Sequence, residues 1–170
     1  LVDVQAAGVI SYAIGNWPPP WGIEYRIDAA NSFLLVLLGL VATVVALYAR
    51  TSVAAEIPEE QRYLFYAMYC LCLAGLLGIV ITRDLFNIFL FMEISSLSTY
   101  VLIALGRDRR ALVASYQYLI MGTIGATFIV IGIGLLYLMT GTLNLADMGR
   151  RIATVQGTRP VLAALAFLTV

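Results

Sequence analysis

The stretch LFNIFLFMEISSLSTYVLIALG, residues 85–106, carries one charged side chain, Glu93, among mostly apolar neighbours. Its length matches a bilayer-crossing helix, which needs about 20 residues at about 1.5 Å each. Glu93 lies eight residues after Leu85, so it would sit about 12 Å inside a hydrocarbon core about 30 Å thick. An ionised group at that depth costs on the order of a few kcal/mol, and intramembrane acids are functional-site candidates by default. Glu93 is therefore the first candidate for a functional residue.

The composition of the whole chain is that of a membrane protein. Of its 170 residues, 62% are hydrophobic and 12% are charged, whereas a soluble domain carries about 25% charged residues. The composition excludes a soluble fold and predicts an all-α, polytopic bundle of transmembrane helices. The formal net charge is zero, so nothing indicates a nucleic-acid partner, and the expected surroundings are the lipid bilayer.

The apolar runs predict four full spans and two partial ones. The expected spans are residues 1–14 (partial), 29–49, 64–82, 85–106, 112–139 and 160–170 (partial). Because the chain starts without Met and ends inside an apolar run, we expect one membrane domain, truncated at both ends, of a longer protein.

The connections between the spans are short and polar. Three consecutive prolines flanked by Trp17 and Trp21 are typical of a loop at the membrane surface. The two-residue link at 83–84 predicts that the spans on either side of it run antiparallel and side by side. Residues 141–159 are polar and predict a loop with a short helix at the membrane surface. Within the span 112–139, the spacing of Gly122 and Ala126 indicates close helix packing.

The arginines divide evenly between the two sides of the membrane, so their count does not orient the chain. The cluster Arg107, Arg109 and Arg110 lies in a short turn next to a span end, where the positive-inside rule applies most strongly. We therefore expect this turn to face the cytoplasm.

Glu93 has polar neighbours that suggest a proton path. Ser96 and Tyr100 follow it by three and seven residues, so all three share one helical face. Gln117 and Tyr118 open the next span and are further candidates for a polar path. The alternatives are a structural carboxyl for Glu93 and a helix-packing hydrogen bond for Gln117. The chain contains no His, the usual proton shuttle at neutral pH.

Motifs of bond-making catalysis are absent from the sequence. There is no Gly-rich phosphate loop, no Cys/His set with metal spacing and no nucleophile next to a base. We expect no metal site and no cofactor, and nothing in the sequence is positive evidence for an enzyme.

Three segments resemble one known family. The segment DLFNIFLFMEI at 84–94, followed by STY at 98–100, is similar to a signature of the proton-antiporter membrane subunits. The segments GNWPPPWGI at 15–23 and GTLNLADM at 141–148 are similar to motifs of the D-type subunits of Mrp-type sodium/proton antiporters. The family also includes the antiporter-like subunits of respiratory complex I and of membrane-bound hydrogenases.

The resemblance implies a fold and a role. The fold would be part of an inverted-repeat bundle of about fourteen helices. Glu93 would be the fifth-helix glutamate that the family uses for proton transfer. The expected partners are protons, a monovalent cation and other membrane subunits of a hetero-oligomeric complex. The expected location is the cell membrane of a prokaryote, with the turn at 107–110 in the cytoplasm.

The chain differs from the family pattern at residue 117, and it does not include the lysine that pairs with the glutamate in the family. Gln117 stands where the family usually has Lys before the tyrosine. The seventh-helix lysine that pairs with the glutamate is not among these residues, and we expect it shortly after Val170.

Three functions remain open from the sequence. The first is a proton/cation-translocating subunit of a cation/proton antiporter. The second is an antiporter-like membrane-arm subunit of a redox-driven complex, either complex I-like or a membrane-bound hydrogenase. The third is a scaffold subunit that does not transport, for which Gln117 is the best support.

Overall fold

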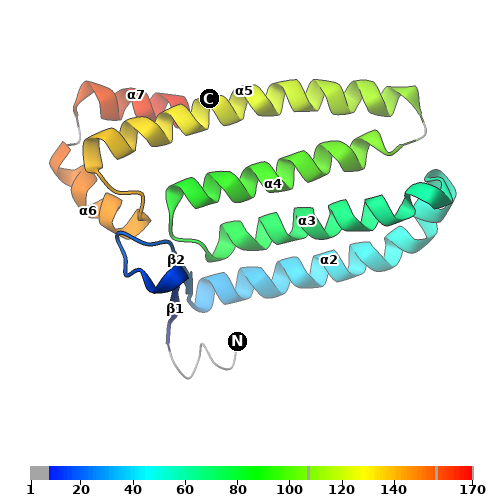
Figure 1. The fold of residues 1–170 in the computed structure, drawn as a ribbon, viewed down its shortest axis with the longest axis horizontal. Helices are drawn as coiled ribbons and strands as arrows, with labels where there is room; N and C mark the ends of the chain where they lie inside the picture. Colours follow the sequence, from blue (N-terminus) through cyan, green and yellow to red (C-terminus); the bar gives the residue numbers. More distant parts are fainter. Residues whose placement is uncertain (1–7, 107, 156, 170) are drawn as a thin grey trace.

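The computed structural model describes residues 8–106, 108–155 and 157–169 (Figure 1). Arg107, Gln156, Val170 and the first seven residues lie outside the described residues, so predictions on them are not addressed. The elements are β1 (Ile10–Ala13), η1 (Ile14–Asn16), β2 (Glu24–Ile27), α2 (Ala29–Glu56), η2 (Glu59–Gln61), α3 (Arg62–Ile81), α4 (Leu85–Ala104), α5 (Arg109–Thr140), α6 (Leu145–Val155) and α7 (Arg159–Leu168).

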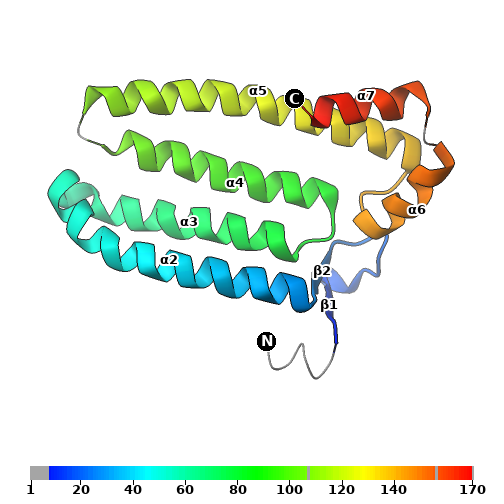
Figure 2. The same ribbon diagram turned by 180° about the vertical axis from the view of Figure 1, so that it is seen from behind.

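The four long helices lie side by side in the order of the chain (Figures 1 and 2). Each packs against its sequence neighbour, and α7 packs against α5. All four are long and apolar enough to cross a membrane, and most of their residues are not buried within the described chain. An apolar surface of this extent suits contact with lipid or with other membrane helices. The prediction of an all-α transmembrane bundle is confirmed.

Helix ends follow local sequence signals more than the limits of the apolar runs. The α2 helix begins at the capping carboxylate of Asp28, which accepts a hydrogen bond from the Asn31 backbone N–H at 2.9 Å. It continues past Arg50 to Glu56, seven residues beyond the predicted span. At 32 residues, α5 is about 48 Å long, which is more than the hydrocarbon core requires. It ends at Gly141, whose left-handed backbone (φ 68°) is the usual helix C-terminus.

The expected partial helix over residues 1–14 is wrong for its last third. Residues 10–13 form strand β1, which pairs antiparallel with β2 and places Tyr12 opposite Tyr25. The proline-rich segment and η1 connect the two strands. The hydrophobicity of Ile10 and Ala13 is compatible with either structure, and pairing with a strand eleven residues further along the chain decides between them.

Backbone hydrogen bonds join three connections at one end of the bundle. The Arg83 N–H donates to the Glu24 carbonyl at 2.9 Å, and the Leu145 N–H donates to the Arg83 carbonyl at 2.9 Å. Asp84 and Asn144 form an isolated antiparallel bridge. The β-hairpin, the α3–α4 link and the α5–α6 link are thereby held together at this end.

Helix α6 confirms the short helix predicted within residues 141–159. Its apolar side, including Met148 and Ile152, packs against Leu136 of α5 and Val161 of α7. Its location at the membrane surface stays a prediction.

Candidate functional site

The face of α4 that meets α3 is closely packed. A Cβ added at Gly75 of α3 would lie 2.8 Å from the carbonyl oxygen of Phe91 and 2.9 Å from the nitrogen of Ser95. The Cys72 sulfur lies 3.4 Å from the Ser95 hydroxyl and 3.5 Å from the Thr99 hydroxyl. Thiol and hydroxyl groups on this face therefore have partners across the α3–α4 contact.

A different face of α4 meets α5 around Tyr100. The Tyr100 side chain is buried, and its ring packs edge-on against Tyr118 with 5.0 Å between the centroids. The Ser115 hydroxyl donates a hydrogen bond to the Tyr100 carbonyl at 2.7 Å. A Cβ added at Gly122 would overlap the Tyr100 hydroxyl. The phenol of Tyr100 thus lies directly against the backbone of α5.

Glu93 lies on the same face of α4 as Tyr100. Seven residues correspond to about two helical turns, so the two side chains point to the same side, away from the α3 contact of Ser95 and Thr99. Glu93 is half-buried. Among the described residues, the ion pairs join Arg83 to Asp28 and Arg151 to Asp147, and neither includes Glu93.

The hydroxyl groups of α4 divide into two sets. Ser98 donates to the Ile94 carbonyl at 2.6 Å and Thr99 donates to the Ser95 carbonyl at 2.9 Å. Within the described part of the chain, the side chains of Glu93, Ser96 and Tyr100 make no hydrogen bond to protein. We call these three residues the α4 polar strip. Its groups are available to water or to a partner from outside these residues.

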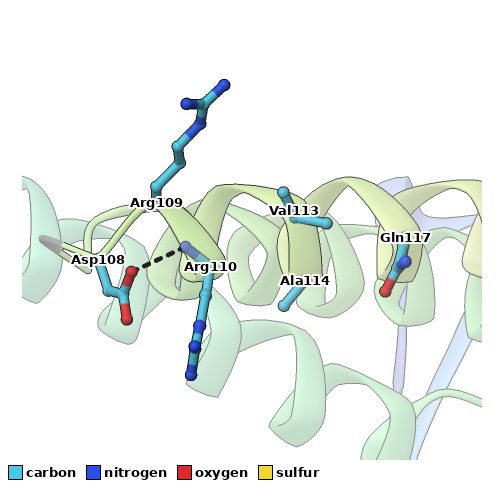
Figure 3. A pocket seen from close by; sticks show the side chains of 6 residues that line it. All are labelled: Asp108, Arg109, Arg110, Val113, Ala114 and Gln117. Carbon is cyan, nitrogen blue, oxygen red and sulfur yellow. Dashed lines mark hydrogen bonds between the residues drawn. The ribbon is translucent and has the colours of Figure 1, made fainter.

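Gln117 is not brought to this strip. It is exposed and lines a surface pocket of about 490 Å³ at the start of α5 (Figure 3). The pocket is lined by Asp108, Arg109, Arg110, Val113, Ala114 and Gln117. Figure 3 shows Arg109 and Arg110 pointing in opposite directions from the first turn of the helix. Of the two candidates on α5, the structure places Tyr118 against Tyr100 and leaves Gln117 exposed among the described residues.

Of the carboxylates that cap helix starts, Asp28 and Asp84 have pKa values shifted in opposite directions. The Asn31 backbone N–H holds the pKa of Asp28 below its ordinary value of 3.8, with a further lowering from the Arg83 guanidinium at 2.9 Å. Burial raises the pKa of Asp84 above 3.8, although the Asn87 N–H donates to it at 2.8 Å. Within the described residues, no three side chains of His, Cys, Asp or Glu gather as metal ligands would.

Some contacts of the site were not predicted from the sequence. The hydrogen bond from Ser115 to α4 and the position of Cys72 between Ser95 and Thr99 depend on how three helices are rotated against one another. The close packing predicted at Gly122 is present, and its partner is the Tyr100 hydroxyl.

Comparison with known families gives a match over the second half of the chain. Residues 82–170 match the family described as NADH:quinone oxidoreductase/Mrp antiporter, transmembrane. The matched region includes α4 with its polar strip, and α5, α6 and α7.

Curated relatives resemble nearly the whole chain. The chain is 45% identical over 157 residues to a protein of Desulforudis audaxviator named as the N subunit of NADH-quinone oxidoreductase, covering 92% of this chain and 31% of that protein. It is 32% identical over 157 residues to a protein of Alkalihalophilus pseudofirmus named as the D subunit of a Na(+)/H(+) antiporter, with the same coverage of 92% and 31%. The chain thus spans about a third of the length of these relatives.

Two solved structures contain the same arrangement of helices. An archaeal respiratory membrane complex, the membrane-bound sulfane sulfur reductase, matches with a TM-score of 0.88 and 33% identity over 98% of this chain and 34% of that chain. The Mrp complex from Dietzia sp. DQ12-45-1b matches with a TM-score of 0.76 and 25% identity over 94% of this chain and 29% of that chain.

Proposed function

Because the chain belongs to the NADH:quinone oxidoreductase/Mrp antiporter transmembrane family, we propose that it is part of an ion-translocating subunit in which Glu93 carries a proton. The observation that carries this proposal is the position of Glu93 in the middle of α4, on a polar strip without protein partners among the described residues. We propose that the full-length protein acts within a multisubunit cation/proton antiporter.

The proposed mechanism alternates Glu93 between its neutral and its ionised form. Glu93 would release its proton when a cationic group of the protein approaches and rebind a proton when that group withdraws. The chain contains no Lys, and we propose that the cationic partner is a lysine elsewhere in the full-length protein. Water bound by Ser96 and Tyr100 would connect the carboxyl to one side of the membrane.

A redox-driven complex is the second candidate. It is favoured by the 45% identity to a protein named as the N subunit of NADH-quinone oxidoreductase and by the match to a respiratory complex. The membrane chemistry of Glu93 would be the same, and electron transfer would drive it. Flavin or iron–sulfur subunits that copurify with the full-length protein would decide for this candidate. Proton movement driven by an added sodium or potassium gradient alone would decide for the antiporter.

A scaffold without transport is less well supported. Its best argument is Gln117 in place of the family's lysine. Gln117 is exposed on the outer surface of α5, and the α4 polar strip does not include it. The loss of a lysine at this position therefore leaves the groups around Glu93 intact.

The remaining parts of the proposal concern the setting. We place the full-length protein in the cell membrane of a prokaryote, with other membrane subunits as partners and the turn before α5 in the cytoplasm.

Replacement of Glu93 by Gln in the full-length protein tests the proposal. Glu93→Gln keeps the shape of the side chain and removes the proton site, so cation-driven proton movement in everted vesicles should fall at least about tenfold. Glu60→Gln is the matched control. Because Glu60 is exposed in η2, this variant should move protons at the wild-type rate. Wild-type rates in Glu93→Gln, at equal protein abundance, would overturn the proposal.

A further inference from the structure

We propose that Gly122 is a positioning residue, which leaves the space for the Tyr100 hydroxyl and so holds this phenol as a proton-relay group for Glu93. The inference rests on the proposed function of Glu93. It adds a residue of α5 and a defined contact to a path that the sequence places on α4.

The contact at Gly122 leaves no space for a side chain. A Cβ at this position would overlap the Tyr100 hydroxyl and lie 2.9 Å from its Cζ. The Tyr100 side chain is only 8% exposed, and its ring packs edge-on against Tyr118. The phenol is therefore held between Tyr118 and the backbone of α5, and the position of its hydroxyl depends on a glycine at 122.

The spacing along α4 suits a relay. Ser96 is three residues after Glu93 and four before Tyr100, so the steps are about 4.5 and 6 Å along the helix axis. These steps separate backbone positions, and water molecules bridging the side chains would complete the relay. The Tyr100 hydroxyl lies against Gly122, thirteen residues after Arg109, and has no protein partner among the described residues.

The contact at Gly122 differs from the other close contact of α4. At Gly75, an added Cβ would meet backbone atoms of Phe91 and Ser95, so a substitution there must separate two helices. At Gly122, the added Cβ would meet the far end of a side chain, so the phenol can move while the helices stay in place. Gly122→Ala is thus expected to displace the hydroxyl without unfolding the protein.

Four variants of the full-length protein in its complex test the inference in everted vesicles. Tyr100→Phe removes the hydroxyl, and Gly122→Ala displaces it. Each should slow cation-driven proton movement at least about tenfold. The double variant should be no slower than Tyr100→Phe alone, because both changes remove the same hydroxyl. Gly125→Ala should keep the wild-type rate, since a Cβ at Gly125 meets no atom of the described residues within 4 Å.

The pH dependence separates a relay from a packing role. If proton delivery limits the rate of the Tyr100→Phe variant, this rate should fall further below the wild-type rate as the pH is raised, because protons become scarcer. If Tyr100 has only a packing role, Tyr100→Phe should transport at the wild-type rate at every pH. The double variant should then be faster than Gly122→Ala alone, because Phe lacks the hydroxyl that the new Cβ meets. That result would overturn the inference. If Glu93→Gln still abolishes proton movement, the proposed function of Glu93 stands even though the inference about Tyr100 and Gly122 fails.

Discussion

Glu93 differs from other carboxylates of the chain in its surroundings. Asp28 and Asp84 each accept a backbone N–H at the start of a helix, at 2.9 and 2.8 Å. Asp147 pairs with Arg151 at 2.9 Å. These three groups have roles that the structure accounts for. Glu93 has no partner of either kind among the described residues, although burial without a partner costs stability.

The titration of Asp84 leads to a prediction about stability. Burial raises the pKa of Asp84, so the folded state binds this proton more tightly than the unfolded state. The contribution of Asp84 to the free energy of unfolding is therefore present at low pH and is lost as the pH rises through the pKa of Asp84 in the folded state. Asp84→Asn keeps an acceptor at the helix start and removes the charge. We therefore expect it to be at least as stable as wild type at neutral pH.

Thermal unfolding of the purified full-length protein across a pH series measures this effect. The advantage of Asp84→Asn should shrink toward about pH 4, near the ordinary pKa of Asp. A variant that is less stable than wild type at neutral pH, and equal to it in acid, would mean that the hydrogen bond from Asn87 outweighs the cost of burial.

At the scale of the element, long apolar runs locate the helices well and their ends less well. Long, mostly apolar runs place α3, α4 and α5 to within a few residues of their observed limits. The predicted span 29–49 ends seven residues before the end of α2 at Glu56. The helix continues through Ala54 and Ala55, which favour helix whether or not they lie in the membrane. Strand β1 could not be predicted, since it depends on pairing with β2.

The contact between α3 and α4 predicts a loss of stability on a small substitution. Gly75→Ala would place a Cβ 2.8 Å from the Phe91 carbonyl oxygen, so the helices must separate. We expect a cost of about 1–3 kcal/mol, as for other overpacked contacts. The measurement is unfolding of the full-length protein in detergent.

Gly39→Ala on α2 is the control for this prediction. A Cβ at Gly39 meets no atom of the described residues within 4 Å, so the substitution should stabilise the helix by up to about 1 kcal/mol through propensity alone. Equal stability of the two variants would contradict the close contact at Gly75.

At the scale of the whole molecule, a single layer of helices accounts for much of the exposed apolar surface. The long helices contact one another in chain order, which leaves wide apolar surfaces such as that of α2, where Phe33, Leu40 and Tyr48 are more than 60% exposed. Hydrophobicity predicts the spans but not this order or the rotation of each helix. The rotation of α5 brings Tyr118 to Tyr100 and leaves Gln117 outside. The polar path through Ser96, Tyr100, Gln117 and Tyr118 stays a proposal, and among the described residues Gln117 lies apart from the α4 polar strip.

The whole account depends on a change of protonation at Glu93. Infrared difference spectroscopy of the full-length protein in membranes, recorded between low and high pH, detects the C=O stretch of a neutral carboxylic acid directly. Of the carboxylic acid bands that disappear as the pH rises in wild type, one component should be missing in Glu93→Gln and retained in Glu60→Gln. An identical band in wild type and in Glu93→Gln would contradict the assignment of Glu93 as the proton carrier.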